Sequence, residues 1–198
     1  MPDASPNETD TLPLPAGERK ESSSPWYALR TFHCREEKLE AWLKGLGLAC
    51  FIPMRYAEVV PKEGGKPKRT LVPAVHNLLF LQKAFPSRRL RTLMADSPVP
   101  FAVLKKADGS APQEIPGRMM AEFRAVCDPG YSGTLYIGSD EADARPGSRV
   151  RVVHGPFTGL EGKLTRYKGR YYVVVSLATV GVLVHIPKWY CEKLPEGE

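Results

Sequence analysis

The chain has 198 residues, of which 42% are hydrophobic and 25% are charged, and its formal net charge is +6. This is the composition of an ordinary water-soluble protein, and because no run of about 18 apolar residues occurs, we expect no transmembrane helix. The first residues lack a basic start followed by an apolar stretch, so no secretory signal is predicted. We therefore expect a cytoplasmic monomer that does not bind membranes.

Enzyme and metal chemistry are not predicted. The four cysteines, Cys34, Cys50, Cys127 and Cys191, form no CxxC pair, which argues against a zinc site or a disulfide framework. None of the HExxH, GxSxG, GxxxxGK or GxGxxG motifs occurs either. We expect reduced thiols, no catalytic residue, no metal and no cofactor.

Charge is distributed unevenly along the chain. Residues 1–24 carry two basic and five acidic side chains, and residues 25–127 carry 17 and nine. Residues 128–145 carry one and four, and residues 146–198 carry eight and four. Two basic blocks are thus separated by an acidic segment. Basic blocks often bind a polyanion, although a merely solvated surface has the same composition.

The N-terminal elements begin after a tail. Residues 1–24 are rich in Pro, Ser and acidic side chains and have no hydrophobic period, which predicts disorder. A short strand is predicted over 26–32 and a helix over 34–48, where Gly45 and Gly47 would end it. The apolar stripe of this helix comprises Leu39, Trp42, Leu43 and Leu46.

The middle of the chain alternates strands with short helices. Residues 49–60 and 69–82 are predicted strands, joined by a flexible basic hairpin tip, PKEGGKPK. A small helix over 86–94 precedes a strand over 99–106. The next helix, over 115–126, has an apolar face of Met119, Met120, Phe123 and Val126.

The remaining residues predict a linker and an all-β domain. Residues 128–145 are acidic and rich in Gly and Ser, which indicates a linker, although TLYI within it could pair locally. Residues 146–195 hold several short strands between Gly155, Gly159, Gly162 and Gly169, typical of a tightly turned SH3-like barrel. The predicted fold class is α+β: an antiparallel sheet with helices on one face over 25–127, then this barrel.

Two stretches resemble the NusG-type transcription elongation factors. PGSRVRVVHGPFTGLEGKLTRYKGRYYVVVSL resembles their KOW motif, and the block opened by Trp26 and Tyr27, with FIP at 51–53 and VPAVHNLLFL at 72–81, resembles their N-terminal (NGN) domain. The stretches VPAVHNL and IPGRMMAEF look most like the UpxY group of specialised paralogs, which act as antiterminators on long capsular polysaccharide operons.

The resemblance implies a non-enzymatic factor that binds RNA polymerase and promotes processive transcription. Its NGN domain would dock on the clamp helices of the polymerase β′ subunit through apolar residues on and before the strand, Val72, Val75, Leu78 and Phe80. Alternate residues of a strand must also face a core, so each of the four could equally be an ordinary core residue.

The resemblance also assigns a DNA-facing side and a second partner site. The non-template DNA strand would be contacted at the end of the first strand and on the small helix, through Arg30, His33, Arg35, Arg88, Arg89 and Arg91. Phe157, in the GPF turn, would touch Rho or a small-subunit ribosomal protein, or would instead cap the barrel end. A KOW-containing RNA-binding or ribosome-associated protein is the alternative, but it leaves the apolar NLLFL strand without a role.

Overall fold

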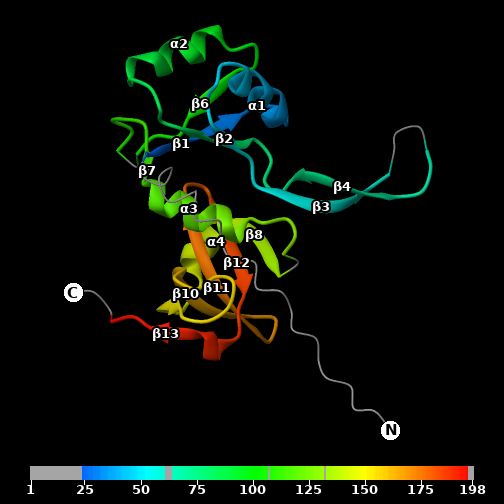
Figure 1. Ribbon diagram of the computed structural model, residues 1–198, viewed down its shortest axis with the longest axis vertical. Coiled ribbons are helices and arrows are strands. Elements are labelled where there is room, and N and C mark those ends of the chain that lie inside the picture. Colours follow the sequence, from blue (N-terminus) through cyan, green and yellow to red (C-terminus); the bar gives the residue numbers. More distant parts are fainter. Residues whose placement is uncertain (1–23, 61–63, 107, 132, 196–198) are drawn as a thin grey trace, which may run out of the picture.

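The computed structural model describes residues 24–60, 64–106, 108–131 and 133–195 (Figure 1). These residues form two larger antiparallel sheets, a helix between them and a separate two-stranded ribbon that projects to one side. The predicted tail lies outside the described residues, apart from Ser24. In the described part of the chain, no helix is long and apolar enough to cross a membrane.

The first sheet is built around β1 (Trp26–Thr31). Its four-strand path is β2 (Cys50–Phe51), β5 (Leu78–Gln82), β1 and β6 (Phe101–Val103), and β7 (Glu114–Ile115) also pairs with β1. In this register Ala28 lies opposite Phe80, and Arg30 lies opposite Leu78. β1 is therefore central, which explains why four of its residues, Tyr27, Ala28, Leu29 and Thr31, are at most 1% exposed.

Two helices cover one face of this sheet. They are α1 (Glu36–Gly45) and α2 (Arg88–Asp96), whose buried leucines pack on Tyr27, Leu29, Leu79 and Leu81. In α1 the predicted stripe is confirmed at Leu39 and Leu43, whereas Leu46 is exposed. Gly47 has φ 73°, and its N–H donates to the Lys44 carbonyl, which ends the helix as predicted.

The third helix covers the opposite face. α3 (Gly117–Val126) buries Met120, Phe123 and Val126 in one cluster with Leu78 and Phe80. The rings of Phe123 and Phe80 meet edge-on with centroids 5.4 Å apart. The prediction that the helices lie on one face is therefore wrong, because both faces of the apolar strand need cover. Met119, predicted to be apolar core, is exposed.

The second sheet is all antiparallel and open. Its order is β13 (Cys191–Lys193), β9 (Ser148–Val152), β10 (Glu161–Tyr167), β11 (Arg170–Leu177), β12 (Val180–His185) and β8 (Thr134–Gly138). A short 3-10 helix, η2 (Lys188–Tyr190), precedes β13. The mixed α+β class is confirmed. The sheet is not closed, since β13 and β8 are its two edges.

The predicted linker contains regular structure. TLYI belongs to β8, so a strand is present there, but its partner from Thr134 to Gly138 is the distant β12 and not a local segment. The helix α4 (Ser139–Ala144) follows immediately and packs on the same sheet through Ala142. Within residues 134–144, β8 is thus a strand of the second sheet and α4 packs on that sheet, so these residues are not an extended linker. The division into domains at 127, 128 and 145 stays a prediction.

The valine-rich strand β11 is buried on both faces. Val173 and Val175 join the same cluster as α3, whereas Tyr172 and Val174 pack with Ala142 of α4. Gly162 of β10 makes this packing possible: a Cβ there would lie 2.6 Å from Val173 Cγ1 and from the Val174 carbonyl oxygen. A side chain at this position would collide with β11, which is why a glycine stands within the strand.

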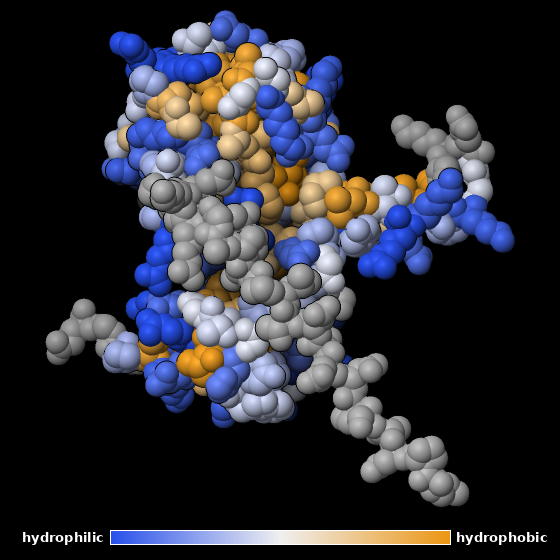
Figure 2. Space-filling view, viewed as in Figure 1, coloured by the Kyte–Doolittle hydropathy of each residue, from blue (hydrophilic) through white to orange (hydrophobic). Residues whose placement is uncertain are grey.

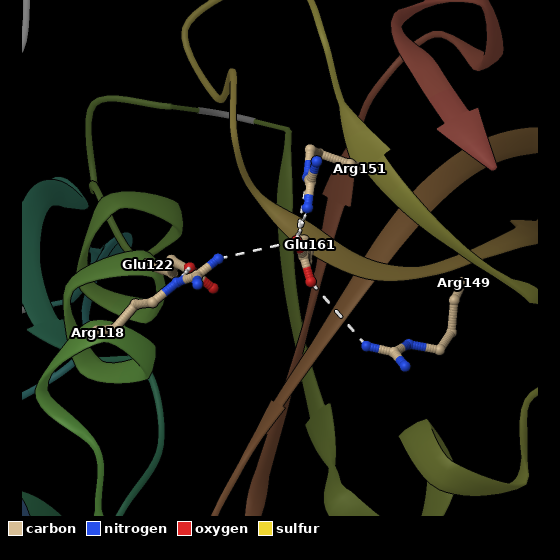
Figure 3. A network of polar contacts seen from close by, with 5 residues as sticks. All are labelled: Arg118, Glu122, Arg149, Arg151 and Glu161. Atoms are coloured by element: carbon tan, nitrogen blue, oxygen red, sulfur yellow. Dashed lines mark hydrogen bonds and ion pairs between the residues drawn. The ribbon is translucent and has the colours of Figure 1, made fainter. Parts of the chain in front are cut away.

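Polar contacts also join α3 to the second sheet (Figure 3). Glu161 Oε1 lies 2.6 Å from Arg151 Nη2 and 3.7 Å from Arg118 Nη2, and Glu161 Oε2 lies 4.0 Å from Arg149. The hydrogen bond from Arg151 is the main cause of the lowered pKa of Glu161. Because Arg118 belongs to α3, the Glu161 carboxylate links α3 to the second sheet, beside the apolar cluster that the two share.

We expect Phe123→Ala to lower the free energy of unfolding by about 3–5 kcal/mol, because it removes a fully buried ring from the cluster that both sheets share. Met119→Ala, on the exposed side of the same helix, should change it by less than about 0.5 kcal/mol. Urea denaturation followed by circular dichroism measures both. Equal effects of the two substitutions would contradict the packing of α3.

Candidate nucleic-acid interface

The loop between β1 and α1 is locked against the turn that precedes β5. Three residues of these segments have left-handed backbones: His33 at φ 60°, Cys34 at 52° and Asn77 at 60°. The Cys34 N–H donates to Asn77 Oδ1 at 2.8 Å, and the Thr31 N–H donates to the Asn77 carbonyl at 3.1 Å. Asn77 therefore fixes the path of the loop from both its side chain and its backbone.

A buried carboxylate lies beneath these turns. Glu36 is 1% exposed, and its Oε2 lies 3.4 Å from the Thr31 hydroxyl, which donates to it. Its Oε1 lies 3.6 Å from Nδ1 of the exposed His76. Burying a carboxylate is costly unless it is hydrogen-bonded, and here the Thr31 hydroxyl donates to Oε2 whereas Oε1 accepts no hydrogen bond from the described residues, so Glu36 joins the start of α1 to the end of β1.

The outer side of this region carries cations and an aromatic ring. Arg30, His33 and Arg35 are all exposed, and they lie at the C-terminal end of β1 and in the loop that follows it. Phe32 is exposed between them. Guanidinium groups bind phosphate bidentately, and exposed rings stack on bases, so this loop has the side chains needed to bind a nucleotide strand. We name Arg30, Phe32, His33 and Arg35 the loop site.

Sequence reasoning did not find Phe32, His76 or Asn77. The signal for Asn77 was present, because asparagine adopts left-handed conformations more readily than most residues. Phe32 and His76 could not be assigned, since nothing in the sequence shows that the two turns meet.

The three arginines of α2 form a separate basic surface. Arg88, Arg89 and Arg91 are exposed at the start of the helix, and its buried side consists of Leu90 and Leu93. The chain enters this helix from the end of the sheet where β1 begins, since the Lys83 N–H donates to the Pro25 carbonyl. The loop site lies at the other end of β1, so the structure does not bring the two groups together.

The predicted polymerase-contact residues divide into two pairs. Leu78 is 3% exposed and Phe80 is 0% exposed, which fits the alternative in which both are core residues, and their polymerase-binding role stays a prediction. Both are buried because α3 covers the face of β5 that would otherwise be open. Val72 and Val75 are half-buried, at the end of β4 (Lys68–Pro73) and in the turn after it, and their role stays a prediction.

Phe157 is also less open than a free contact residue would be. It is half-buried, and its ring meets Tyr131 edge-on with centroids 4.9 Å apart. The Tyr131 hydroxyl donates to the His185 carbonyl at 2.6 Å, which holds that ring over the sheet. The alternative in which Phe157 caps one end of the sheet has this contact in its favour, and its partner role stays a prediction.

Comparison with known proteins identifies one family. The family model described as "Transcription termination factor nusG" matches residues 24–124, which include the first sheet, its helices and the loop site. No curated protein matches the chain. Among the described residues, no group of three or more His, Cys, Asp or Glu side chains could hold a metal ion.

Cys34 lies in the same loop, between two residues of the loop site, and its thiol is exposed, so it can be labelled chemically. We expect it to react first with a thiol reagent at pH 8. Burial raises the pKa of Cys50 to about 11 and that of Cys127 to about 12, so at pH 8 only about one Cys127 thiol in 10,000 is ionised. Mass spectrometry of the partly labelled protein identifies the modified residue. Early labelling of Cys127 would contradict the structure.

Proposed function

The chain belongs to the NusG family of transcription factors, and we propose that it is an elongation factor of the antiterminator type, which holds RNA polymerase in a processive state. Factors of this family bind RNA polymerase and are not enzymes. The observation that carries the proposal is the family match over 24–124, because it covers the part of the chain that the ribosome-associated alternative leaves without a role.

The loop site is proposed to contact the exposed non-template DNA strand. Its support is that Arg30, Phe32 and Arg35 are all exposed, on a loop whose Thr31 and Cys34 N–H groups both donate to Asn77. A rigid loop loses little conformational entropy on binding, which favours affinity. Arg88, Arg89 and Arg91 would extend the contact as a second basic surface at the far end of the sheet.

The polymerase is proposed to dock at Val72 and Val75, on the β′ clamp helices. These two valines lie where the projecting ribbon meets the first sheet, and both keep part of their apolar surface accessible. Leu78 and Phe80 would support this surface from beneath rather than touch the partner. The role of these core residues is then to fix the position of the turn at 74–77.

Finer assignments rest on sequence resemblance. The second sheet would be a KOW domain, and Phe157 with its turn would meet Rho or a small-subunit ribosomal protein after Tyr131 moves aside. The stretches VPAVHNL and IPGRMMAEF favour the UpxY group, and with it a long operon of the capsular polysaccharide type as the target.

A pull-down with core RNA polymerase tests the main partner. We expect Val72→Asp and Val75→Asp each to weaken binding more than tenfold, because a carboxylate would be buried in an apolar contact. Val153→Asp, which changes a half-buried valine directly after β9 of the second sheet, is the matched control and should bind like the wild type. Circular dichroism must show that all three variants are folded. Undiminished binding by folded Val72 and Val75 variants would contradict this docking site.

Labelling of Cys34 tests the DNA contact independently. A single-stranded DNA oligonucleotide should slow its reaction with a maleimide severalfold, since Cys34 lies between His33 and Arg35. Replacing Arg30 and Arg35 by Gln should remove this protection, because the phosphate contacts are lost. The same loss on replacing Arg145 and Arg149, far from the loop, would indicate unspecific attraction instead.

A further inference from the structure

The most exposed large hydrophobic side chain among the described residues is Trp189, which has no role so far. It belongs to η2, between β12 and β13, and 78% of its surface is accessible, whereas Trp26 of the first sheet is 5% exposed. Single exposed hydrophobic residues are common on protein surfaces, so the neighbours of this ring decide whether it marks a site.

Aromatic rings surround this tryptophan. The rings of Trp189 and Tyr190 meet edge-on with centroids 6.5 Å apart, and those of Tyr190 and His154 do so at 5.8 Å. Tyr190 lies against the turn after β9, where Gly155 leaves room for it: a Cβ there would lie 2.9 Å from Tyr190 Cε2. The half-buried Tyr190 is thus anchored on this turn and connects two exposed rings, Trp189 and His154.

Two exposed cations lie beside these rings. Lys188 Nζ lies 5.6 Å from the centroid of the Tyr171 ring, and Arg166 is directly opposite Tyr171 in the strand register, so it lies on the same side of the sheet. The nearest acidic residue along the chain, Glu192, lies opposite Arg151. No ion pair joins Lys188 or Arg166 to an acidic side chain within the described ranges, so both charges are available to an anionic partner.

This combination favours an unpaired nucleic-acid strand over a protein. The core of a protein–protein interface is depleted of lysine and other charged residues. On the face of the second sheet seen in Figure 2, the surface is mostly hydrophilic and its hydrophobic patches are small. Surfaces that bind single strands combine exposed rings, on which bases stack, with cations that follow the phosphates. A duplex keeps its bases stacked on one another, so it would leave Trp189 without a partner.

We propose that Trp189, Lys188, Arg166 and His154 form a binding site for single-stranded RNA. A base would stack on Trp189, and the two cations would contact neighbouring phosphates. The exposed His154 has ring nitrogens that can hydrogen-bond a ribose 2′-hydroxyl, which DNA lacks. Figure 1 places β13, which follows η2 directly, at the end of the molecule away from the first sheet. The site therefore goes beyond the proposed function, in which the loop site on the first sheet contacts DNA.

Fluorescence anisotropy of a labelled uridine oligonucleotide of about 12 nucleotides tests the proposal with the full chain. Every protein compared also has Arg30 and Arg35 changed to Gln, so that the loop site does not contribute and a failure of the DNA contact proposed there cannot affect the result. We expect Trp189→Ala to weaken binding about tenfold, because one stacked base is lost. Trp189→Phe keeps a ring and should lose less than about threefold.

The matched control is Tyr56→Ala in β3 (Met54–Val59) of the projecting ribbon. Tyr56 is 46% exposed, but the Arg69 guanidinium covers its ring at 4.4 Å from the centroid, so it offers no free face to a base. This variant should bind within about twofold of its parent protein. Lys188→Gln should lower the slope of log affinity against log salt by about 0.7, the value for one phosphate contact of a single strand.

Four results would overturn the proposal. No loss on Trp189→Ala would exclude stacking, and an equal loss on Tyr56→Ala would indicate unspecific attraction. Equal affinity for a thymidine oligonucleotide of the same length, which should bind more weakly, would contradict the assignment to RNA. Because Trp189 is exposed, its alanine variant should keep the urea midpoint of the parent protein. If that midpoint falls, the salt slope of Lys188→Gln decides, and an unchanged slope would exclude the site.

Discussion

The contact between Phe80 and Phe123 is the constraint on which the rest of the structure depends. It places α3 on the face of the first sheet that α1 and α2 leave open, and the same cluster continues into the valines of β11 and β12. The helix α3 thus gives both sheets a common core. The ion pair between Glu161 and Arg118 lies at the edge of this core. The surfaces left for partners are consequently loops and the projecting ribbon, not the faces of the sheets.

Much of the fold was predictable from local patterns. The stripe at Leu39 and Leu43 and the end of α1 at Gly45, shortly before the left-handed Gly47, follow from helical spacing and from glycine geometry. Whether Leu78 and Phe80 are buried or exposed could not be predicted, because an apolar strand has the same sequence whether a partner protein or its own chain covers it. That question is decided by α3, more than 35 residues away in the sequence.

The candidate site shows the same division. Arg30, His33 and Arg35 could be grouped from the sequence because they are near neighbours at the end of one strand. The exposure of Phe32 could not be predicted, because the sequence does not show which side of the loop faces solvent. The role of Asn77 could not be predicted either, because the sequence does not show that the turn before β5 contacts the loop. His33, Cys34 and Asn77 adopt left-handed backbone conformations where the loop contacts this turn. Such conformations cost free energy, and surrounding hydrogen bonds must offset it, as they do here.

The central claim is that the polymerase binds while α3 stays in place, through the turn at 72–77 and the surfaces beside it. Hydrogen exchange of the chain, alone and with core RNA polymerase, measures this most directly. We predict slower exchange over 72–77 and the loop site on binding, with α3 and β5 as protected as in the free protein. Faster exchange in α3 on binding, with Leu78 and Phe80 becoming the protected contact, would contradict the account.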